Sequence, residues 1–208
     1  MIEISILEIE NIKIGNAENQ EAKTGVTAIL CETCAPCGVD IRGGGPASRE
    51  TPLLSPLAAS TGVHAVLLCG GSAFGLDAAG GAMRYLEEKG IGFDTGITKV
   101  PLVCASSIFD LGLGDKNVRP DFSMGYRACV NAEAGNYQNG SFGAGCVATV
   151  GKFLGPEFAL KSGIGSFAVQ LGTLKVGAIV CVNALGDIYQ GGKIVAGLLS
   201  EDKKGFRS

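Results

Sequence analysis

The sequence predicts a single α/β domain, and three observations favour that fold class. A chain of 208 residues with 46% apolar residues is long enough to bury a substantial core. Several apolar runs have the length and composition of strands. Residues 63–88 join a strand, a glycine-rich turn and an amphipathic helix in that order. We place the domain at residues 1–199 and interpret residues 200–208, which lack apolar periodicity, as a flexible tail.

The first half of the chain predicts four strands and one helix. The strands are expected at residues 2–6, 12–14, 26–31 and 63–68, where aliphatic residues dominate. Gly70 to Gly75 then form a tight loop, and apolar positions from Leu76 to Leu86 fall on one face of a helix. Lys89 and Gly90 supply a basic last turn and a stop for that helix.

The second half predicts a strand, a helix and a hairpin. Residues 100–110 indicate a buried strand that runs towards Phe109, and Asp121 can cap a short helix through Ala134. Residues 166–171 and 174–182 indicate two strands joined by Gly172 and Thr173, a pair that suits a type II′ turn. Asn183 follows where the second strand ends, either pointing into a site or bonded to its own backbone.

Composition excludes several classes of function. Charged residues make up only 18% of the chain, the net charge is −3, and Lys and Arg are scattered, so we expect no nucleic-acid partner. The first 15 residues carry acidic rather than basic residues and do not resemble a secretory signal. No stretch approaches the ~20 apolar residues of a spanning helix. We therefore expect a soluble, cytoplasmic protein without a membrane partner.

The eight cysteines favour reduced thiols that pack as small apolar side chains, because disulfides belong to secreted chains. Cys31, Cys34 and Cys37 differ, since a CxxCxxC spacing offers three thiolates to zinc or an iron–sulfur cluster. A fourth ligand is not nearby, and the alternative is a cysteine-rich strand end. We expect neither a metal nor a cofactor.

Ser72 lies between the predicted strand and helix, where an α/β-hydrolase carries its nucleophile. That nucleophile needs glycine two residues away on both sides, but Phe74 occupies the later position. His64, the only histidine, lies at the start of the preceding strand and favours a structural role. A hydrolase built from this chain would therefore activate its nucleophile with a free α-amino group or a lysine.

Six segments, in this order, resemble one family over nearly the whole chain. They are TGVTAILCE, RGGGPASRETPLL, VHAVLLCGGSAFGLDAAGGAMRYLEEKGIGF, IFDLGLGD, GAGCVATVGK and VGAIVCVNALGD. The chain is similar to the DmpA-like aminopeptidases, which include L-aminopeptidase/D-amidase-esterases, β-peptidyl aminopeptidases and nylon-oligomer hydrolases. The resemblance implies a four-layer αββα sandwich like that of N-terminal nucleophile hydrolases and ornithine acetyltransferases, and hydrolysis of small peptides, amides or esters.

The resemblance also implies self-processing. In this family a precursor cuts its own backbone before a Ser or Thr, whose hydroxyl and new α-amino group become nucleophile and base. The family's nucleophile lies some tens of residues beyond the position of Asn183, so we expect it outside the printed sequence. Residues 1–208 would then be the large N-terminal α fragment, with a C-terminal β fragment as companion and a homo-oligomer of αβ units as assembly.

Matching motifs carry roles onto individual residues. Asn183 would donate its side-chain N–H to the oxyanion, and Lys152 matches a lysine near the nucleophile, with a solvated surface lysine as the alternative. Phe109 stands where relatives often have Tyr, so it would line an apolar substrate pocket instead of supplying a hydroxyl. Gly71 and Ser72 are expected at the floor of that pocket, with a helix cap as the alternative for Ser72.

Two other functions stay open at this point. One is acyl transfer of the ornithine acetyltransferase kind, because that group shares the self-cleaving architecture by resemblance. The other is a non-catalytic protein whose glycine loops bind a small anionic metabolite, since backbone N–H groups at such turns attract anions.

Overall fold

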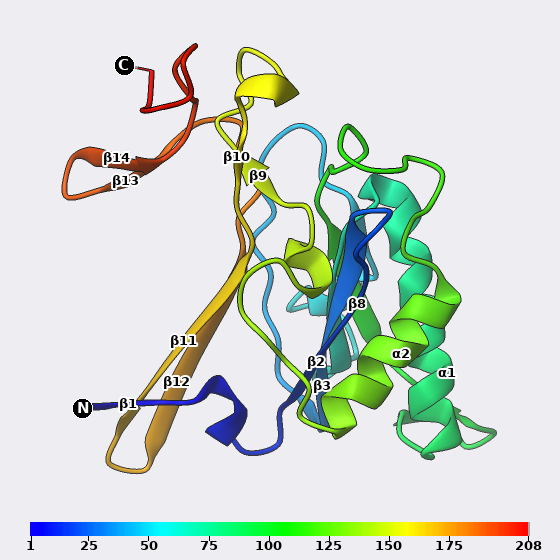
Figure 1. The fold of residues 1–208 in the computed structure, drawn as a ribbon. Coiled ribbons are helices and arrows are strands. Elements are labelled where there is room, and N and C mark those ends of the chain that lie inside the picture. The colour runs from blue at the N-terminus through cyan, green and yellow to red at the C-terminus, as the bar shows by residue number, and fades with distance from the viewer. Residues whose placement is uncertain (208) are drawn as a thin grey trace.

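The structure is a computed structural model that describes residues 1–207 (Figure 1). A five-stranded sheet forms its centre, in the order β2-β3-β5-β8-β4. Its strands are β2 (Lys13–Asn19), β3 (Thr24–Ala35), β4 (Ser48–Arg49), β5 (Val63–Cys69) and β8 (Val103–Ser107). Helices α1 (Ala78–Glu88) and α2 (Phe122–Glu133) cover one face of this sheet (Figure 1).

The main core lies between this sheet and the two helices. Buried aliphatic side chains of β3, β5 and β8, such as Val26, Leu67 and Val103, meet alanines of both helices. The helices approach very closely because a glycine on each helix faces the backbone of the other helix. A Cβ on Gly81 would overlap the carbonyl oxygen of Phe122, and one on Gly125 would overlap that of Ala78.

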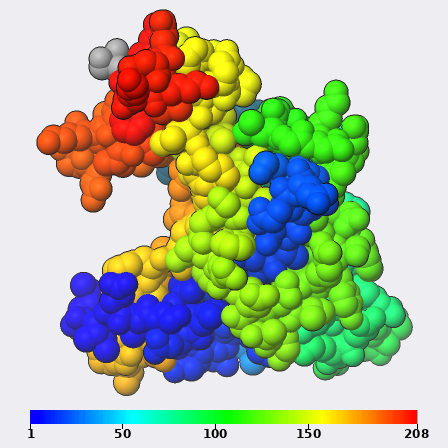
Figure 2. Space-filling model, in the orientation of Figure 1, coloured from blue at the N-terminus to red at the C-terminus, as the bar shows by residue number. Residues whose placement is uncertain are grey.

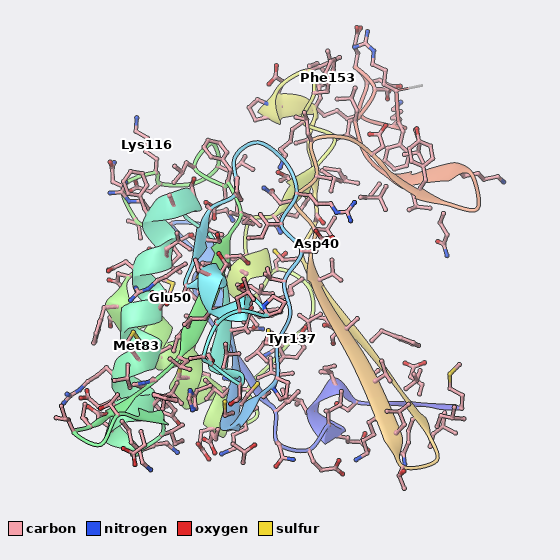
Figure 3. All side chains as sticks on the ribbon, turned by 180° about the vertical axis from the view of Figure 1, so that it is seen from behind. Asp40, Glu50, Met83, Lys116, Tyr137 and Phe153 are labelled. Atoms are coloured by element: carbon pink, nitrogen blue, oxygen red, sulfur yellow. The ribbon has the colours of Figure 1, made fainter. Side chains whose placement is uncertain are left out.

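A second, smaller sheet packs on the other face of the first. It contains β1 (Ile2–Ile4), β11 (Ile164–Leu171) and β12 (Leu174–Cys181), in the order β1-β11-β12. Ala168 and Ile179 turn inward to meet Ile14 and Ile29 of the first sheet. Tyr137 packs into the same cluster, and Figure 3 shows it between the first sheet and the hairpin of β11 and β12.

The described residues therefore supply one helical layer and two β-layers of the expected αββα sandwich. The outer face of the β11–β12 hairpin carries only apolar residues and glycine. Its exposed large side chains are Phe167, Leu171, Leu174, Val176 and Val180. Within residues 1–207, no helix covers this face.

Short pairs of strands complete the fold. They are β6 (Phe93–Asp94) with β7 (Lys99–Val100), β9 (Thr149–Val150) with β10 (Leu160–Lys161), and β13 (Ile188–Gln190) with β14 (Lys193–Ala196). The β13–β14 hairpin projects away from both sheets (Figure 1). Short 3-10 helices lie at Ile6–Glu8, Thr51–Leu54, Ser72–Asp77, Gly143–Gly145 and Pro156–Phe158.

Most predicted elements are present. Asp121 caps α2, accepting a hydrogen bond from the Met124 N–H at 2.8 Å, and the helix ends at Glu133 with Ala134 as its C-cap, one residue before the expected end. Gly172 has φ 60, which a type II′ turn requires at that position. Helix α1 begins two residues later than expected, because the 3-10 helix Ser72–Asp77 takes up the end of the predicted loop and the first positions of the apolar face.

One predicted strand is wrong in its extent. Residues 100–110 do not form one strand, because β7 ends at Val100 and β8 covers only Val103–Ser107. Pro101, which has no N–H for a strand ladder, separates the two. After Ser107 the chain bends across the end of β5, where the Ile108 N–H binds the Cys69 oxygen at 2.9 Å. Phe109 and Asp110 therefore lie in a loop.

The C-terminal segment folds back on the preceding residues. The Arg207 N–H donates to the Leu198 oxygen at 2.8 Å, and the Ser200 N–H donates to the Gly205 oxygen at 2.9 Å. The flexibility expected for residues 200–208 stays a prediction, and Ser208 lies outside the described residues. Among residues 1–207, no helix is both long and apolar enough to span a bilayer.

Candidate functional site

Three segments meet at the ends of the two sheets and bring Asn183, Lys152 and Phe109 together. The Asn183 side chain donates from Nδ2 to the Phe109 carbonyl oxygen at 2.8 Å. Its Oδ1 accepts from Lys152 Nζ at 2.7 Å and from the Thr149 N–H at 3.2 Å. The three residues that the sequence connects only through a family resemblance therefore form one cluster.

Backbone pairing explains why these side chains meet. After β12 the chain runs beside the segment that follows β9. There the Gly151 N–H binds the Gly186 oxygen at 2.9 Å, and the Lys152 N–H binds the Leu185 oxygen at 2.8 Å. Gly151 has φ 66, and a Cβ there would overlap Gly197 and Leu198. Glycine is thus required just before Lys152.

Lys152 is half-buried, and its ammonium makes two hydrogen bonds. Besides Asn183 Oδ1, its ammonium contacts the Asn183 carbonyl oxygen at 3.1 Å. Burial lowers the pKa of Lys152, and the charge of nearby Asp110 partly opposes that effect. The alternative of a solvated surface lysine is therefore wrong.

Asp110 is a buried carboxylate that our sequence interpretation passed over. Its Oδ1 accepts the Gly71 N–H at 2.6 Å, and its Oδ2 accepts the Thr24 hydroxyl at 3.2 Å. Burial raises the pKa of Asp110, and these two hydrogen bonds act in the opposite direction. A Cβ on Gly70 would overlap Oδ2, so the Gly70–Gly71 pair makes room for this carboxylate. The Gly70–Gly71 pair was the feature of the sequence that could have indicated a side chain packed closely against this turn.

Gly71 and Ser72 lie on the far side of Asp110. Gly71, with φ 78, precedes the 3-10 helix Ser72–Asp77, and its own Cβ would lie 2.7 Å from Pro120 Cδ. Ser72 is the first residue of this 3-10 helix, Gly71 is its N-cap and Asp77 is the N-cap of α1, so the cap interpretation of Ser72 is wrong. Its backbone N–H instead binds the Ile108 oxygen at 2.9 Å. Neither Gly71 nor Ser72 lines the pocket that contains Phe109, so the expected floor position is wrong, and a role of either residue in substrate binding stays a prediction.

A small pocket of about 190 Å³ opens beside the cluster. Phe109, Leu113 and Pro156 give it apolar walls, while Thr149 and Lys152 reach its polar end. Phe109 is 66% exposed, so its ring is available to an incoming ligand. This arrangement is consistent with the apolar pocket expected at Phe109. Thr149, which contributes through its backbone N–H, left no signal in the sequence.

His64 and the cysteine motif contribute no chemistry to this site. His64 is buried, and its Nδ1 accepts the Leu102 N–H at 3.1 Å, which confirms the structural role. Cys31, Cys34 and Cys37 are free thiols that range from buried to exposed. Within residues 1–207, no group of three or more His, Cys, Asp or Glu side chains is arranged to hold a metal ion.

The cluster contains two groups that can stabilise negative charge on an oxygen atom, the Asn183 amide and the Lys152 ammonium. One hydrogen of Asn183 Nδ2 is used by Phe109, and the amide carries a second hydrogen on the same nitrogen. The Lys152 ammonium lies next to it and fixes the orientation of the amide through Oδ1. A pre-oriented N–H donor next to a cation and an apolar pocket is typical of an oxyanion-binding site.

Comparisons of the sequence with a family model and with individual proteins agree on one family. Residues 5–205 match peptidase family S58. An uncharacterized aminopeptidase of Mycobacterium tuberculosis is 38% identical over 195 residues, which cover 88% of this chain and 54% of that protein. A 6-aminohexanoate-oligomer endohydrolase of Kocuria sp. is 30% identical over 194 residues, which cover 91% of this chain and 51% of that enzyme.

Solved structures show the same fold. A Burkholderia sp. β-aminopeptidase aligns with a TM-score of 0.63 at 20% identity, covering 86% of this chain and 52% of that one. The L-aminopeptidase D-Ala-esterase/amidase of Ochrobactrum anthropi, described as a variant of the Ntn hydrolase fold, aligns with a TM-score of 0.63 at 21% identity. That alignment covers 86% of this chain and 53% of the Ochrobactrum chain.

The chain thus spans about half the length of the relatives that it matches. The family match nevertheless extends over almost all of the described residues. This chain belongs to peptidase family S58.

Proposed function

We propose that this chain forms the N-terminal part of a self-processing N-terminal nucleophile hydrolase that cleaves small peptides, amides or esters. The observation that carries the proposal is the hydrogen-bonded pair of Asn183 and Lys152 beside an apolar pocket. The nucleophilic Ser or Thr would come from outside the printed sequence, which spans about half the length of the relatives that it matches.

In the proposed reaction, the nucleophile and the Asn183–Lys152 pair have different roles. The nucleophile's hydroxyl attacks the substrate carbonyl and gives its proton to its own α-amino group, which returns it to the leaving group. The carbonyl oxygen becomes negatively charged and is met by the second Nδ2 hydrogen of Asn183. One such donor is typically worth about 3 kcal/mol of transition-state stabilisation. Lys152 holds the amide in place and adds positive charge nearby.

We also propose that a companion C-terminal β fragment covers the apolar outer face of the β11–β12 hairpin. Five large apolar side chains are exposed there, each by more than half. Contiguous apolar patches of this kind mark interaction surfaces. Figure 2 shows the molecule hollowed between the β13–β14 hairpin and the N-terminal segment, which leaves space beside the β11–β12 hairpin for further chain. We propose further that such αβ units assemble into a homo-oligomer.

The full-length protein provides the test. Its intact mass and N-terminal sequences should reveal two chains, the second beginning with Ser or Thr. The purified protein should hydrolyse at least one of three substrate classes: α-aminoacyl amides, β-aminoacyl amides and 6-aminohexanoate oligomers. These are chosen because the relatives are named for peptide and oligomer hydrolysis. A single uncleaved chain without hydrolysis of any of them would contradict the proposal.

A further inference from the structure

A second pocket, of about 240 Å³, lies on the opposite edge of the first sheet, between β2, α2 and the loop that follows α2. None of its lining residues belongs to the Asn183 cluster. Its volume is below the roughly 300–1,000 Å³ of pockets for drug-sized ligands, so it suits a small molecule. Its walls are mainly polar: two charged side chains, Glu18 and Arg127, and several carboxamides face it.

The two charges in this pocket are of opposite sign but do not pair. Arg127 projects from α2 and makes no ion pair or hydrogen bond with any residue in the range 1–207. Glu18 projects from β2 and uses Oε2 to accept the Gly143 N–H at 2.8 Å, while Oε1 has no partner among the same residues. A cation and an anion therefore line one cavity and leave space between them.

Carboxamides supply neutral donors and acceptors around the two charges. Asn136 and Gln138 line the pocket, and their exposed side chains make no hydrogen bonds within the described part of the chain. The loop that carries them is held firmly, because the Asn16 amide donates to the Gln138 carbonyl oxygen at 2.8 Å and Asn131 donates to the Asn16 carbonyl oxygen at 2.6 Å. Phe142 contributes an apolar wall. The exposed polar side chains are thus free to bind a ligand, and the backbone that carries them is held in place.

We propose that this pocket binds a free amino acid as its zwitterion, with the carboxylate on Arg127 and the ammonium on Glu18. A guanidinium binds a carboxylate through paired, charge-assisted hydrogen bonds. A ligand with a single charge would satisfy one side chain and be repelled by the other, so the pocket discriminates against simple anions and simple cations. Asn136 and Gln138 are placed to bind the remaining polar atoms, and Phe142 to contact the side chain.

Binding is measured on the full chain by following backbone amide resonances during titration with L-alanine and L-leucine. We expect saturable shifts at residues that line the pocket, Glu18, Asn131 and Gln138 among them. N-acetyl-L-alanine, which lacks the ammonium, and L-alaninamide, which lacks the carboxylate, should bind at least tenfold more weakly. Each loses one charge-assisted contact, and a tenfold weakening corresponds to about 1.4 kcal/mol of binding free energy.

Variants identify the pocket. Arg127→Gln should weaken L-alanine binding at least tenfold, as should Glu18→Gln, which keeps an acceptor for the Gly143 N–H. Arg84→Gln, which changes an exposed arginine on α1 outside the pocket, should bind as the unchanged protein does. Absence of saturable shifts, or full binding by Arg127→Gln, would overturn the proposal. The measurement is independent of hydrolysis, so its failure leaves the proposed function untouched.

Discussion

At the scale of single residues, Asn183 connects most of the site. Its amide contacts a lysine, a backbone N–H and a backbone carbonyl, which come from two other segments of the chain. An amide with all these partners has a fixed orientation, with one N–H left for a ligand. Because Asn183 makes these contacts and Ser72 does not, we expect their substitutions to differ in their effect on kcat.

Asn183→Ala in the full-length protein should lower kcat by about 10²–10³, since that is the usual cost of removing one oxyanion donor. Ser72→Ala should have a much smaller effect, because the structure gives the Ser72 hydroxyl no partner in residues 1–207 and places it outside the Phe109 pocket. Steady-state kinetics on processed enzyme measure both. If Ser72→Ala abolished turnover while processing stayed normal, a simple serine hydrolase would be the better description.

Asp110→Asn is expected to change the titration of Lys152. Asparagine can still accept from Gly71, but the negative charge that favours the ammonium is lost, so the pKa of Lys152 should fall further. Isotope-edited NMR of the lysine side chain measures that pKa directly. Asp115→Asn, an exposed change in the same loop, serves as the control. An unchanged Lys152 titration in Asp110→Asn would contradict the predicted coupling.

The shifted pKa values of Lys152 and Asp110 determine whether stability rises or falls with pH. Lys152 has a lowered pKa in the folded state, so the unfolded chain binds more protons between that pKa and about 10.5. Stability therefore rises with pH through that window as far as Lys152 is concerned. Asp110 has a raised pKa, so its contribution to stability falls as pH rises from about 3.8 through the folded value.

At the scale of secondary-structure elements, the contact between α1 and α2 depends on glycine. Gly81→Ala should destabilise the protein by about 1–3 kcal/mol or more, because the new methyl group would overlap the Phe122 backbone. Gly80→Ala, one residue earlier, meets only the Phe122 ring, at 3.3 Å. That ring can move, and alanine favours the helix by up to about 1 kcal/mol. Urea unfolding of the pair should show opposite signs, and equal destabilisation would refute this account of the helix contact.

Elements with strong local signals were predictable from the sequence. The Asp121 cap, the Lys89–Gly90 stop and the Gly172 turn each depend on neighbouring residues, and all three are present. The strand expected at residues 100–110 was too long, because Pro101 interrupts it at one end and contacts with β5, which lies far away in the sequence, set the other end. Asp110 was missed for the same reason, since its partners Thr24 and Gly71 come from other segments. The cluster around Asn183 was predictable only through resemblance.

At the scale of the whole molecule, the outer face of β11 and β12 is an exposed apolar surface made by five large side chains. Replacing Phe167 and Val176 by serine should weaken the association of a separately expressed C-terminal half with this chain. Burial of apolar surface contributes about 25 cal/mol per Å², so the loss of two apolar side chains should make the free energy of association measurably less favourable. Leu57→Ser, a nearly fully exposed apolar residue in a loop, is the matched control. Co-purification measures the effect, and equal recovery of the partner with all three proteins would contradict it.

A single hydrogen bond, from Asn183 Nδ2 to the Phe109 oxygen, joins the end of one sheet to a loop of the other. Asn183 follows β12, whereas Phe109 follows β8, so the two groups keep their distance only while the layers stay in register. The geometry of the site therefore depends on how the two sheets pack against each other. On heating, catalytic inactivation should precede the loss of helical signal, because sliding of the layers disables Asn183 before either helix unfolds.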